Sequence, residues 1–367
     1  MAIQKISGVT IDLDNQASGD VTYFDGTDWV RLGKGEAGEV LKMNETETAP
    51  EWGEPPWTFP GTVRGYCASG NTNPSGHGEG PRGIDRWSFT SDADATDVGD
   101  VVIGRHHTAG QSSDTHGYIS GSQINGPVVS NIDRWSFDSE GNATDHGDLA
   151  VQSGYSTGQS SETHGYHVGG HGTPFGPNTY LNNIQKFPFA STGSTNNATD
   201  IADLTVARTA FAGGSSSTHG YTAGGGGPTV PRDITIDKFK YASDANATNV
   251  GDCDTLAGSC AGTSSLTYGY AVGGESPNVP NTSSIRKYSF TTDGDSVSTG
   301  ADLTVERHAN SGMSSETFGY SAAGHWAPYG GALNIVEKFS VTSDSDATDV
   351  GNLTVARWYS SPVGSQV

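Results

Sequence analysis

The sequence predicts an all-β chain in which residues 58–367 form a six-bladed β-propeller with four short antiparallel strands in each blade. Three observations lead to this prediction: an internal repeat, short alternating segments inside each repeat, and a composition rich in turn-forming residues. A Gly-Tyr pair recurs six times, at spacings of 52, 48, 55, 49 and 50 residues. Repeats of about 50 residues that each supply four strands are typical of propellers. The pairs are Gly65-Tyr66, Gly117-Tyr118, Gly165-Tyr166, Gly220-Tyr221, Gly269-Tyr270 and Gly319-Tyr320.

The composition favours a folded β-protein and argues against several functions. The 367 residues include 52 Gly, and the 7 Trp, 14 Tyr and 12 Phe provide apolar rings to bury in every repeat. With 41 acidic and 19 basic residues the net charge is −22, which disfavours binding to nucleic acid. The sequence contains no apolar run of membrane-spanning length and no signal peptide at its start. We therefore expect synthesis in a cytoplasm, no export by the usual route and no membrane insertion.

Each repeat contains four predicted strands in the same order. A Ser-Ser-x-Thr-aromatic run leads into the Gly-Tyr strand, and a glycine pair such as Gly169-Gly170 ends that strand before a variable stretch. The third strand alternates apolar and polar residues, as in residues 132–137, and the fourth follows an Asp/Asn/Gly turn, as in residues 347–357. None of these segments shows the 3.6-residue apolar period of a helix.

The two ends of the repeat region are predicted to complete one blade together. The first repeat begins near Thr62 without its Ser-Ser-x-Thr strand, whereas Arg357–Val363 follow the sixth repeat as an additional strand. We expect this C-terminal strand to join the first blade, because the closed ring then has no open sheet edge.

The order of motifs inside the repeat resembles that of a known family. An arginine, a short apolar strand, Gly-Tyr-x-x-Gly-Gly and an Ile-x-Lys/Arg-aromatic strand follow one another, and this order resembles the kelch repeat over roughly residues 58–367. Gly121-Ser122 replaces one glycine pair, and the Trp customary in the fourth strand is absent. The resemblance implies that the diglycine ends the second strand near the central channel. The regulator-of-chromosome-condensation repeat, which has a similar period, is the alternative.

Residues 1–57 lie outside the repeat and are predicted to form a separate N-terminal module. Residues 19–32 predict a β-hairpin around Asp25-Gly26-Thr27-Asp28. The pattern continues through Gly33 and Val40-Leu41 to Ala49-Pro50-Glu51-Trp52, and it resembles a module of bacteriophage tail-fibre and other virion-fibre proteins. The resemblance implies a homotrimer that attaches to other virion proteins. The residues that we expect to serve attachment and trimerisation are Tyr23, Trp29, Leu32, Val40, Leu41 and Trp52.

We therefore expect a bacteriophage virion fibre, on the tail or the capsid, whose propeller binds a glycan or protein of the host surface. Variable loops on a rigid scaffold are where binding residues collect. The segments after the diglycines carry aromatic and histidine side chains suited to stacking on sugar rings. The candidates are His77, Phe175, Tyr180, Trp326 and Tyr329.

Two other functions stay open. The chain could be a purely structural decoration or neck protein of the virion, without a receptor. It could also be a secreted kelch-type copper oxidase or another carbohydrate-active enzyme. The sequence contains no Gly-x-Ser-x-Gly elbow and no paired Cys and His in a catalytic context, so we expect no catalytic residues and no enzyme.

Closely spaced carboxylates are the one pattern that suggests a metal. Asp92, Asp94 and Asp97 are followed by a glycine as in a calcium loop, but the terminal Glu of an EF-hand is missing. Asx-type turns at the outer edge of a blade are the favoured interpretation, and no other cofactor is expected. The same spacing recurs at Asp344, Asp346 and Asp349.

Two further recurring residue types are predicted to be structural. Histidines occupy equivalent repeat positions, where ring packing is favoured over a metal-binding ring around the channel. Recurring arginines are expected to pair with Asp residues between blades. These residues are His116, His164 and His219, and Arg105, Arg208, Arg307 and Arg357.

Overall fold

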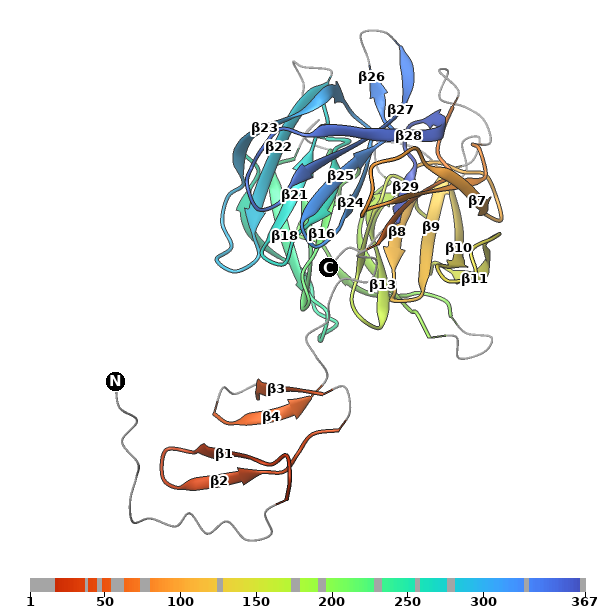
Figure 1. The fold of residues 1–367 in the computed structure, drawn as a ribbon. Helices are drawn as coiled ribbons and strands as arrows, with labels where there is room; N and C mark the ends of the chain where they lie inside the picture. Colours follow the sequence, from red (N-terminus) through yellow and green to blue (C-terminus); the bar gives the residue numbers. More distant parts are fainter. Residues whose placement is uncertain are drawn as a thin grey trace. The chain divides into compact units, whose positions relative to one another are not determined.

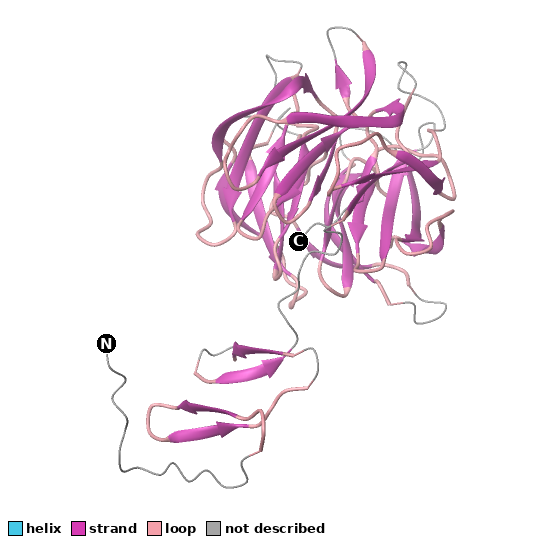
Figure 2. Ribbon diagram, in the orientation of Figure 1, coloured by secondary structure: helices cyan, strands magenta, loops and turns pink. Residues whose placement is uncertain are grey.

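The computed structural model describes two compact units, residues 1–58 and residues 59–367, built entirely of β-strands and loops (Figure 2). Within the described residues there is no helix that could cross a membrane. The described ranges are 17–36, 39–44, 48–53, 63–72, 80–123, 128–172, 179–190, 196–227, 233–254, 258–275, 281–326 and 330–363.

The N-terminal unit consists of two hairpins, as predicted for the first of them. Strands β1 (Val21–Phe24) and β2 (Trp29–Leu32) pair around a turn in which Asp25 Oδ1 accepts hydrogen bonds from the amides of Thr27 and Asp28, both at 2.8 Å. Strands β3 (Val40–Met43) and β4 (Pro50–Gly53) form the second hairpin. The Trp52 indole donates to the carbonyl of Gly33 at 2.6 Å, which ties the second hairpin to the first.

The second unit is a six-bladed propeller, as predicted, with each blade a small antiparallel sheet (Figure 1). Blade 1 contains β29 (Ser361–Val363), β5 (Arg64–Ala68), β6 (Gly83–Ser88) and β7 (Thr96–Asp100); blade 2 contains β8 (Ala109–Ser112), β9 (His116–Gln123), β10 (Val128–Ser136) and β11 (Thr144–Asp148); blade 3 contains β12 (Thr157–Ser160), β13 (His164–His171), β14 (Tyr180–Pro188) and β15 (Thr199–Asp203).

The other three blades repeat this order, and blade 6 carries one extra short strand. Blade 4 contains β16 (Ala212–Ser215), β17 (His219–Ala223), β18 (Thr235–Lys240) and β19 (Thr248–Asp252); blade 5 contains β20 (Ala261–Ser264), β21 (Tyr268–Val272), β22 (Thr282–Ser289) and β23 (Val297–Arg307); blade 6 contains β24 (Ser311–Ser314), β25 (Phe318–Ala322), β26 (His325–Trp326), β27 (Gly331–Ser340) and β28 (Thr348–Arg357).

The ring is closed by the C-terminal strand, which confirms the prediction made for it. Strand β29 pairs antiparallel with β5, with Ser361 opposite Ala68 and Val363 opposite Tyr66. A segment nearly 300 residues downstream therefore supplies the innermost strand of the first blade. Because β29 completes the sheet of blade 1, the inner edge of β5 is paired and no strand edge is left open where the two ends of the ring meet.

The six innermost strands pack against one another around the axis, where there is almost no room for side chains. β8, β12, β16, β20, β24 and β29 each contact the next one in the ring. A Cβ atom added to Gly158 would lie 2.0 Å from the carbonyl oxygen of Gly110, and one added to Gly262 would lie 2.0 Å from that of Gly213. Glycine at this position is therefore required by the approach of neighbouring backbones.

The recurring Gly-Tyr pair builds the core within and between blades. In blades 1, 3, 4, 5 and 6 a Cβ on the glycine would lie 2.2–2.7 Å from the aromatic ring of the third strand, so that ring occupies the space over the glycine. The tyrosine is at most 2 % exposed in every blade and reaches the next one. Tyr320, for example, stacks on Phe89 at 4.3 Å between ring centroids.

Buried ion pairs connect the blades in four of the six positions, as predicted for the recurring arginines. Each arginine lies at the end of the outer strand of one blade or a few residues after it, and it pairs with a carboxylate on the third strand of the next blade. Both side chains are fully buried in every pair. Burial of both partners is favourable only because each charge meets the other. The pairs are Arg105–Asp133, Arg208–Asp237, Arg307–Glu337 and Arg357–Asp85.

The remaining two blades solve the same problem differently. In blade 5 the charges are exchanged, since Arg286 of the third strand pairs with Asp254 at 2.9 Å. In blade 3 the site is uncharged. Buried His167 lies between the hydroxyls of Ser120, 2.9 Å from Nδ1, and Ser153, 2.7 Å from Nε2, and burial lowers the pKa of His167 to about 3.

The inner glycines yield a prediction about packing. Gly262→Ala should lower the free energy of unfolding by about 3 kcal/mol, because the new methyl group overlaps the backbone of the neighbouring blade. Gly331→Ala is the matched control, since nothing lies within 4 Å of a Cβ at that position. Urea unfolding of both variants measures the difference, and equal midpoints would refute the packing account.

His167 yields a prediction about pH. Its pKa in the folded protein lies below the value near 6.5 of an unfolded chain, so between pH 6.5 and pH 3 the unfolded state binds one more proton. Stability is therefore lost as the pH falls through this window. In His167→Gln the unfolding free energy should fall less steeply, by about 1.4 kcal/mol per pH unit. Urea unfolding at pH 7, 5 and 4 tests this, and parallel curves for variant and parent would contradict it.

Candidate functional site

The candidate site is a pocket on the propeller axis, at the end where the inner strands begin. Its rim is a closed ring of six backbone hydrogen bonds, one from each blade to the next, with N···O distances of 2.7–3.0 Å. All six rim residues have positive φ, between 47° and 58°. This left-handed conformation costs a non-glycine residue about 1 kcal/mol or more, and such residues gather at functional sites. The rim residues are His107, Tyr155, Ala210, Ser259, Ala309 and Tyr359.

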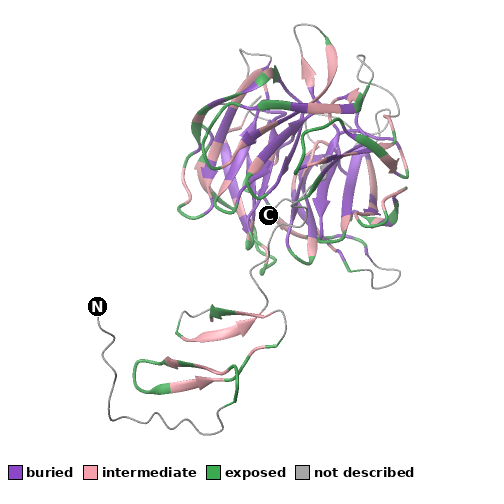
Figure 3. Ribbon diagram, viewed as in Figure 1, coloured by how far each residue is buried: buried purple, intermediate pink, exposed green. Residues whose placement is uncertain are grey.

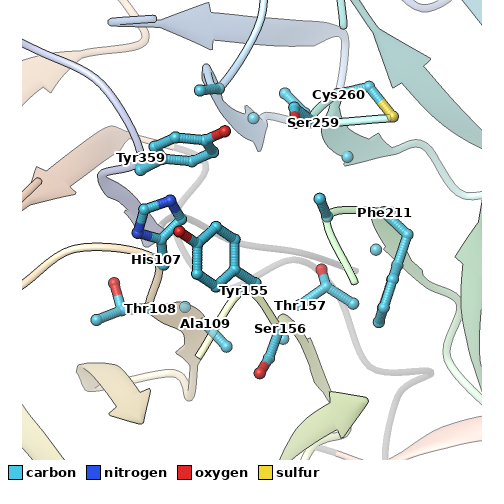
Figure 4. Close-up of a pocket in the computed structure, with 18 of the residues that line it drawn as sticks. His107, Thr108, Ala109, Tyr155, Ser156, Thr157, Phe211, Ser259, Cys260 and Tyr359 are labelled. Carbon is cyan, nitrogen blue, oxygen red and sulfur yellow. The ribbon is translucent and has the colours of Figure 1, made fainter. Parts of the chain in front are cut away.

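The rim is uneven, because large and small side chains are gathered on opposite sides. Blades 1, 2 and 3 contribute Tyr359, His107 and Tyr155, whereas blades 4, 5 and 6 contribute two alanines and a serine. The imidazole of His107 lies against both phenol rings, with centroid distances of 3.6 Å to Tyr155 and 3.7 Å to Tyr359. Figure 4 shows these three rings together on one side of the pocket. The space that a symmetric rim would fill with six rings is open on the other side.

The aromatic side of the rim continues outward as a series of neighbouring rings. The indole of Trp358 lies 4.9 Å from the Tyr359 ring and 4.7 Å from the His325 ring, and His325 lies 5.1 Å from His308. We call this series the aromatic arc. It consists of the three rim rings and of three rings beyond them: Tyr155, His107 and Tyr359 at the rim, then Trp358, His325 and His308.

His107 is the most constrained side chain of the pocket. It is 7 % exposed, and burial together with the nearby His106 holds its pKa well below the usual value, so the ring is neutral at pH 7. Its Nδ1 atom is hydrogen-bonded to Nδ1 of His106. Its Nε2 atom is buried and has no hydrogen-bond partner among the described residues. A buried polar atom without a partner is costly, and a ligand is one way to satisfy it.

The rest of the pocket is uncharged and mixed in polarity. The centre of a water molecule can move through about 80 Å³ of it. Phe211, Ser259 and Cys260 form the wall opposite the aromatic rings (Figure 4). Hydroxyl and amide groups come from Thr108, Ser156, Thr157, Asn310 and Ser360, and none of the described residues that line the pocket is Asp, Glu, Lys or Arg.

The variable segments begin beside this rim. In five blades the residue just before the rim residue forms a β-bridge with a residue that follows the second strand, at the start of the variable segment. The described first residues of these variable segments therefore lie beside the rim of the axial pocket. The bridges join Asn71 to Trp358, Gly154 to His171, Thr209 to Gly226, Gly258 to Glu275 and His308 to His325.

Two of the five predicted loop residues can be placed. Tyr180 begins β14, is half-buried, and lies 4.9 Å from the His171 ring. Trp326 ends β26, is half-buried, and is paired with Gly331. Neither residue lines the axial pocket. His77, Phe175 and Tyr329 lie outside the described residues.

The six carboxylates considered for calcium each bind a group of the protein, either a lysine or a backbone amide. Asp92 and Asp344 pair with the lysines Lys338 and Lys287 of the preceding blade. In the other four, Oδ1 accepts backbone amides: Asp94 from Asn352, Asp346 from Asp302, Asp97 from Gly99 and Asp349 from Gly351, at 2.9–3.1 Å. The part of the chain that the structure describes contains no group of three His, Cys, Asp or Glu residues that could hold a metal ion.

The rim residues were not singled out by sequence reasoning. The equivalent histidines His116, His164 and His219 start second strands, are half-exposed, and do not line the pocket. The available signal was position: in four repeats the rim residue comes two places after the recurring arginine, as His107 follows Arg105. Its identity varies among His, Tyr, Ala and Ser, so no residue type marks it.

The residues of the N-terminal unit predicted to serve attachment are largely accessible. Trp29 and Leu41 are 43 % and 46 % exposed, and Tyr23, Leu32, Val40 and Trp52 are half-buried. Their neighbours Phe24 and Met43 are 55 % and 52 % exposed. In contrast to the propeller strands, no described residue of this unit is buried (Figure 3).

Comparison with known proteins leaves the family open. The chain matches no protein-family model, and no curated protein gives a match to its sequence. The six-bladed propeller is a property of the structure itself, whereas the kelch and virion-fibre resemblances stay predictions.

Proposed function

We propose that this chain is a bacteriophage virion fibre protein. In this proposal the N-terminal unit trimerises and attaches to the particle, and the propeller binds a glycan of the host surface. The observation that carries the proposal is the motif order of residues 19–52, which resembles virion-fibre modules, on a unit that leaves its large apolar side chains exposed.

The exposed side chains support self-association of the N-terminal unit. Two separate two-stranded hairpins bury too little surface to be stable alone in water. Phe24, Trp29, Leu41 and Met43 are each more than 40 % exposed, although all four are large and apolar. Burial of these side chains against two further copies would supply the missing apolar contact.

The propeller supports a binding role at its loop-bearing end. Buried side chains within and between the blades and buried ion pairs hold the strands in place, so the axial pocket is supported by rigid elements. Neutral polar groups beside aromatic rings are suited to sugars, whose rings have apolar C–H faces and hydroxyl edges. The net charge of −22 disfavours a polyanionic partner.

The oligomeric state tests the proposal most directly. Light scattering should give the mass of a trimer for the full chain and of a monomer for residues 59–367. Trp29→Ser combined with Leu41→Ser should weaken the trimer, because both side chains would be buried in it. Lys186→Ser, on the propeller surface, is the control. A monomeric full chain would refute trimerisation by this unit alone.

A purely structural role in the virion makes a different prediction. Such a protein would form the same trimer and bind particle proteins, but it would bind no saccharide. Glycan-array binding by the full chain therefore separates the two roles.

A second candidate function, a copper enzyme of the kelch type, is favoured by one feature of the pocket. His106 and His107 lie beside Tyr155 and Tyr359 at the axis, and imidazole is a common copper ligand. The fit is partial, because the tyrosine rings stack on the His107 ring. Stoichiometric Cu(II) binding seen by visible absorption, together with oxidation of a primary alcohol, would favour this function over the first.

A further inference from the structure

We propose that the axial pocket is the binding site for a single neutral sugar unit, the terminal residue of an uncharged oligosaccharide. The inference rests on the proposed glycan-binding function and makes it specific in place and in chemistry. The carrying observations are the one-sided rim, the buried Nε2 atom of His107 without a partner, and the absence of charge among the lining residues.

The shape of the pocket follows from the rim position of the repeat, which holds a large aromatic side chain in three blades and a small side chain in the other three. The backbone at the rim is the same in all six blades, left-handed and hydrogen-bonded to the next blade. Only the side chains differ, with rings in three consecutive blades and one or two heavy atoms in the other three. The result is a cleft with aromatic rings on one side only, in which the Tyr155 and Tyr359 rings are inclined by 67° to each other (Figure 4). Such rings can pack on the apolar face of a sugar.

The polar groups of the pocket match hydroxyls rather than charges. The lining contains hydroxyl or amide side chains, of which Ser156 donates to the Gly169 carbonyl and the Asn310 amide nitrogen donates to Val272 and Ser321. Thr108 Oγ1 and Asn310 Oδ1 have no hydrogen-bond partner among the described residues, so they can bond a ligand hydroxyl. The His107 Nε2 atom adds a further polar partner at a fixed place. Because this imidazole is neutral, it offers one directed hydrogen bond and not a positive charge.

Acidic sugars are disfavoured for two reasons. Recognition of a carboxylate normally uses arginine. The four arginines that precede a rim residue by two positions are fully buried in ion pairs with carboxylates of the protein. The chain as a whole also carries a charge of −22, which repels an anionic ligand.

The aromatic arc gives the rest of the oligosaccharide a path. Trp358 is half-exposed and adjoins the Tyr359 ring, so a second sugar unit can stack on it while the first occupies the pocket. Binding would thus begin at the axis and continue over blades 1 and 6.

The repeat itself supplies variants that should fold. Alanine occupies the rim in blades 4 and 6, so Tyr155→Ala places in blade 3 a residue that the chain already uses at that position. Tyrosine occupies the rim in blades 1 and 3, so Ala210→Tyr fills the open side of the pocket without a new backbone conformation. Trp326→Ala, in β26 and outside the pocket lining, tests binding by the variable segments instead, and Lys186→Ser, on the propeller surface, is the control.

The test is saturation-transfer NMR and titration calorimetry with the full chain. The probes are methyl glycosides and trisaccharides of glucose, galactose, mannose and N-acetylglucosamine, with N-acetylneuraminic acid and glucuronic acid as acidic counterparts. We expect a neutral sugar to bind and both rim variants to weaken it at least tenfold. Lys186→Ser should change its affinity less than threefold, and thermal unfolding should confirm that all variants are folded.

The other outcomes are distinct. Binding that is lost in Trp326→Ala but kept in both rim variants would overturn the axial site and leave glycan binding by the loops intact. Binding of the acidic sugars alone would overturn the assignment of a neutral ligand. Absence of binding by every saccharide would overturn the site and the glycan-binding function together, while the light-scattering result on trimerisation would stand independently.

Discussion

The packing of six inner strands around one axis is the constraint on which the rest of the propeller depends. The strands approach so closely that the backbone of one blade occupies the place where a side chain of the next would begin, as Gly213 does for Gly262. In blades 2 to 6 the residue at this position is glycine, which allows the close approach of neighbouring inner strands. The closed circle of backbone hydrogen bonds at the rim then joins the first and sixth blades through Tyr359, which precedes the C-terminal strand.

Once the ring is closed, each blade has the same polar groups to satisfy, and the chain satisfies them in three ways. Four blades use a buried arginine and carboxylate, blade 5 exchanges the charges in Arg286–Asp254, and blade 3 uses neutral His167 between two serines. Each of these solutions avoids an unpaired buried charge. The repeat can therefore diverge at these positions provided that both partners change together.

The same reasoning explains why binding capacity is concentrated at the axis. Rim residues are held by backbone hydrogen bonds, so their side chains contribute little to closure and are free to vary. Blades 1 to 3 use this freedom for aromatic rings, and blades 4 to 6 use it for small side chains. A ring that is symmetric in its backbone thus acquires a one-sided pocket.

The sequence by itself determined the number of blades, the strand order within each blade, the C-terminal strand of blade 1 and the pairing of the recurring arginines. These features depend on local patterns repeated at a fixed period, and a pattern such as Gly-Tyr has one packing consequence wherever it occurs. Only the tertiary structure decided which side chains meet at the axis. His107, Tyr155 and Tyr359 come from segments up to about 250 residues apart, and their position carries no residue-type signal. They come together because each rim residue precedes an inner strand and its backbone is hydrogen-bonded to the rim residues of the neighbouring blades, which requires the closed ring.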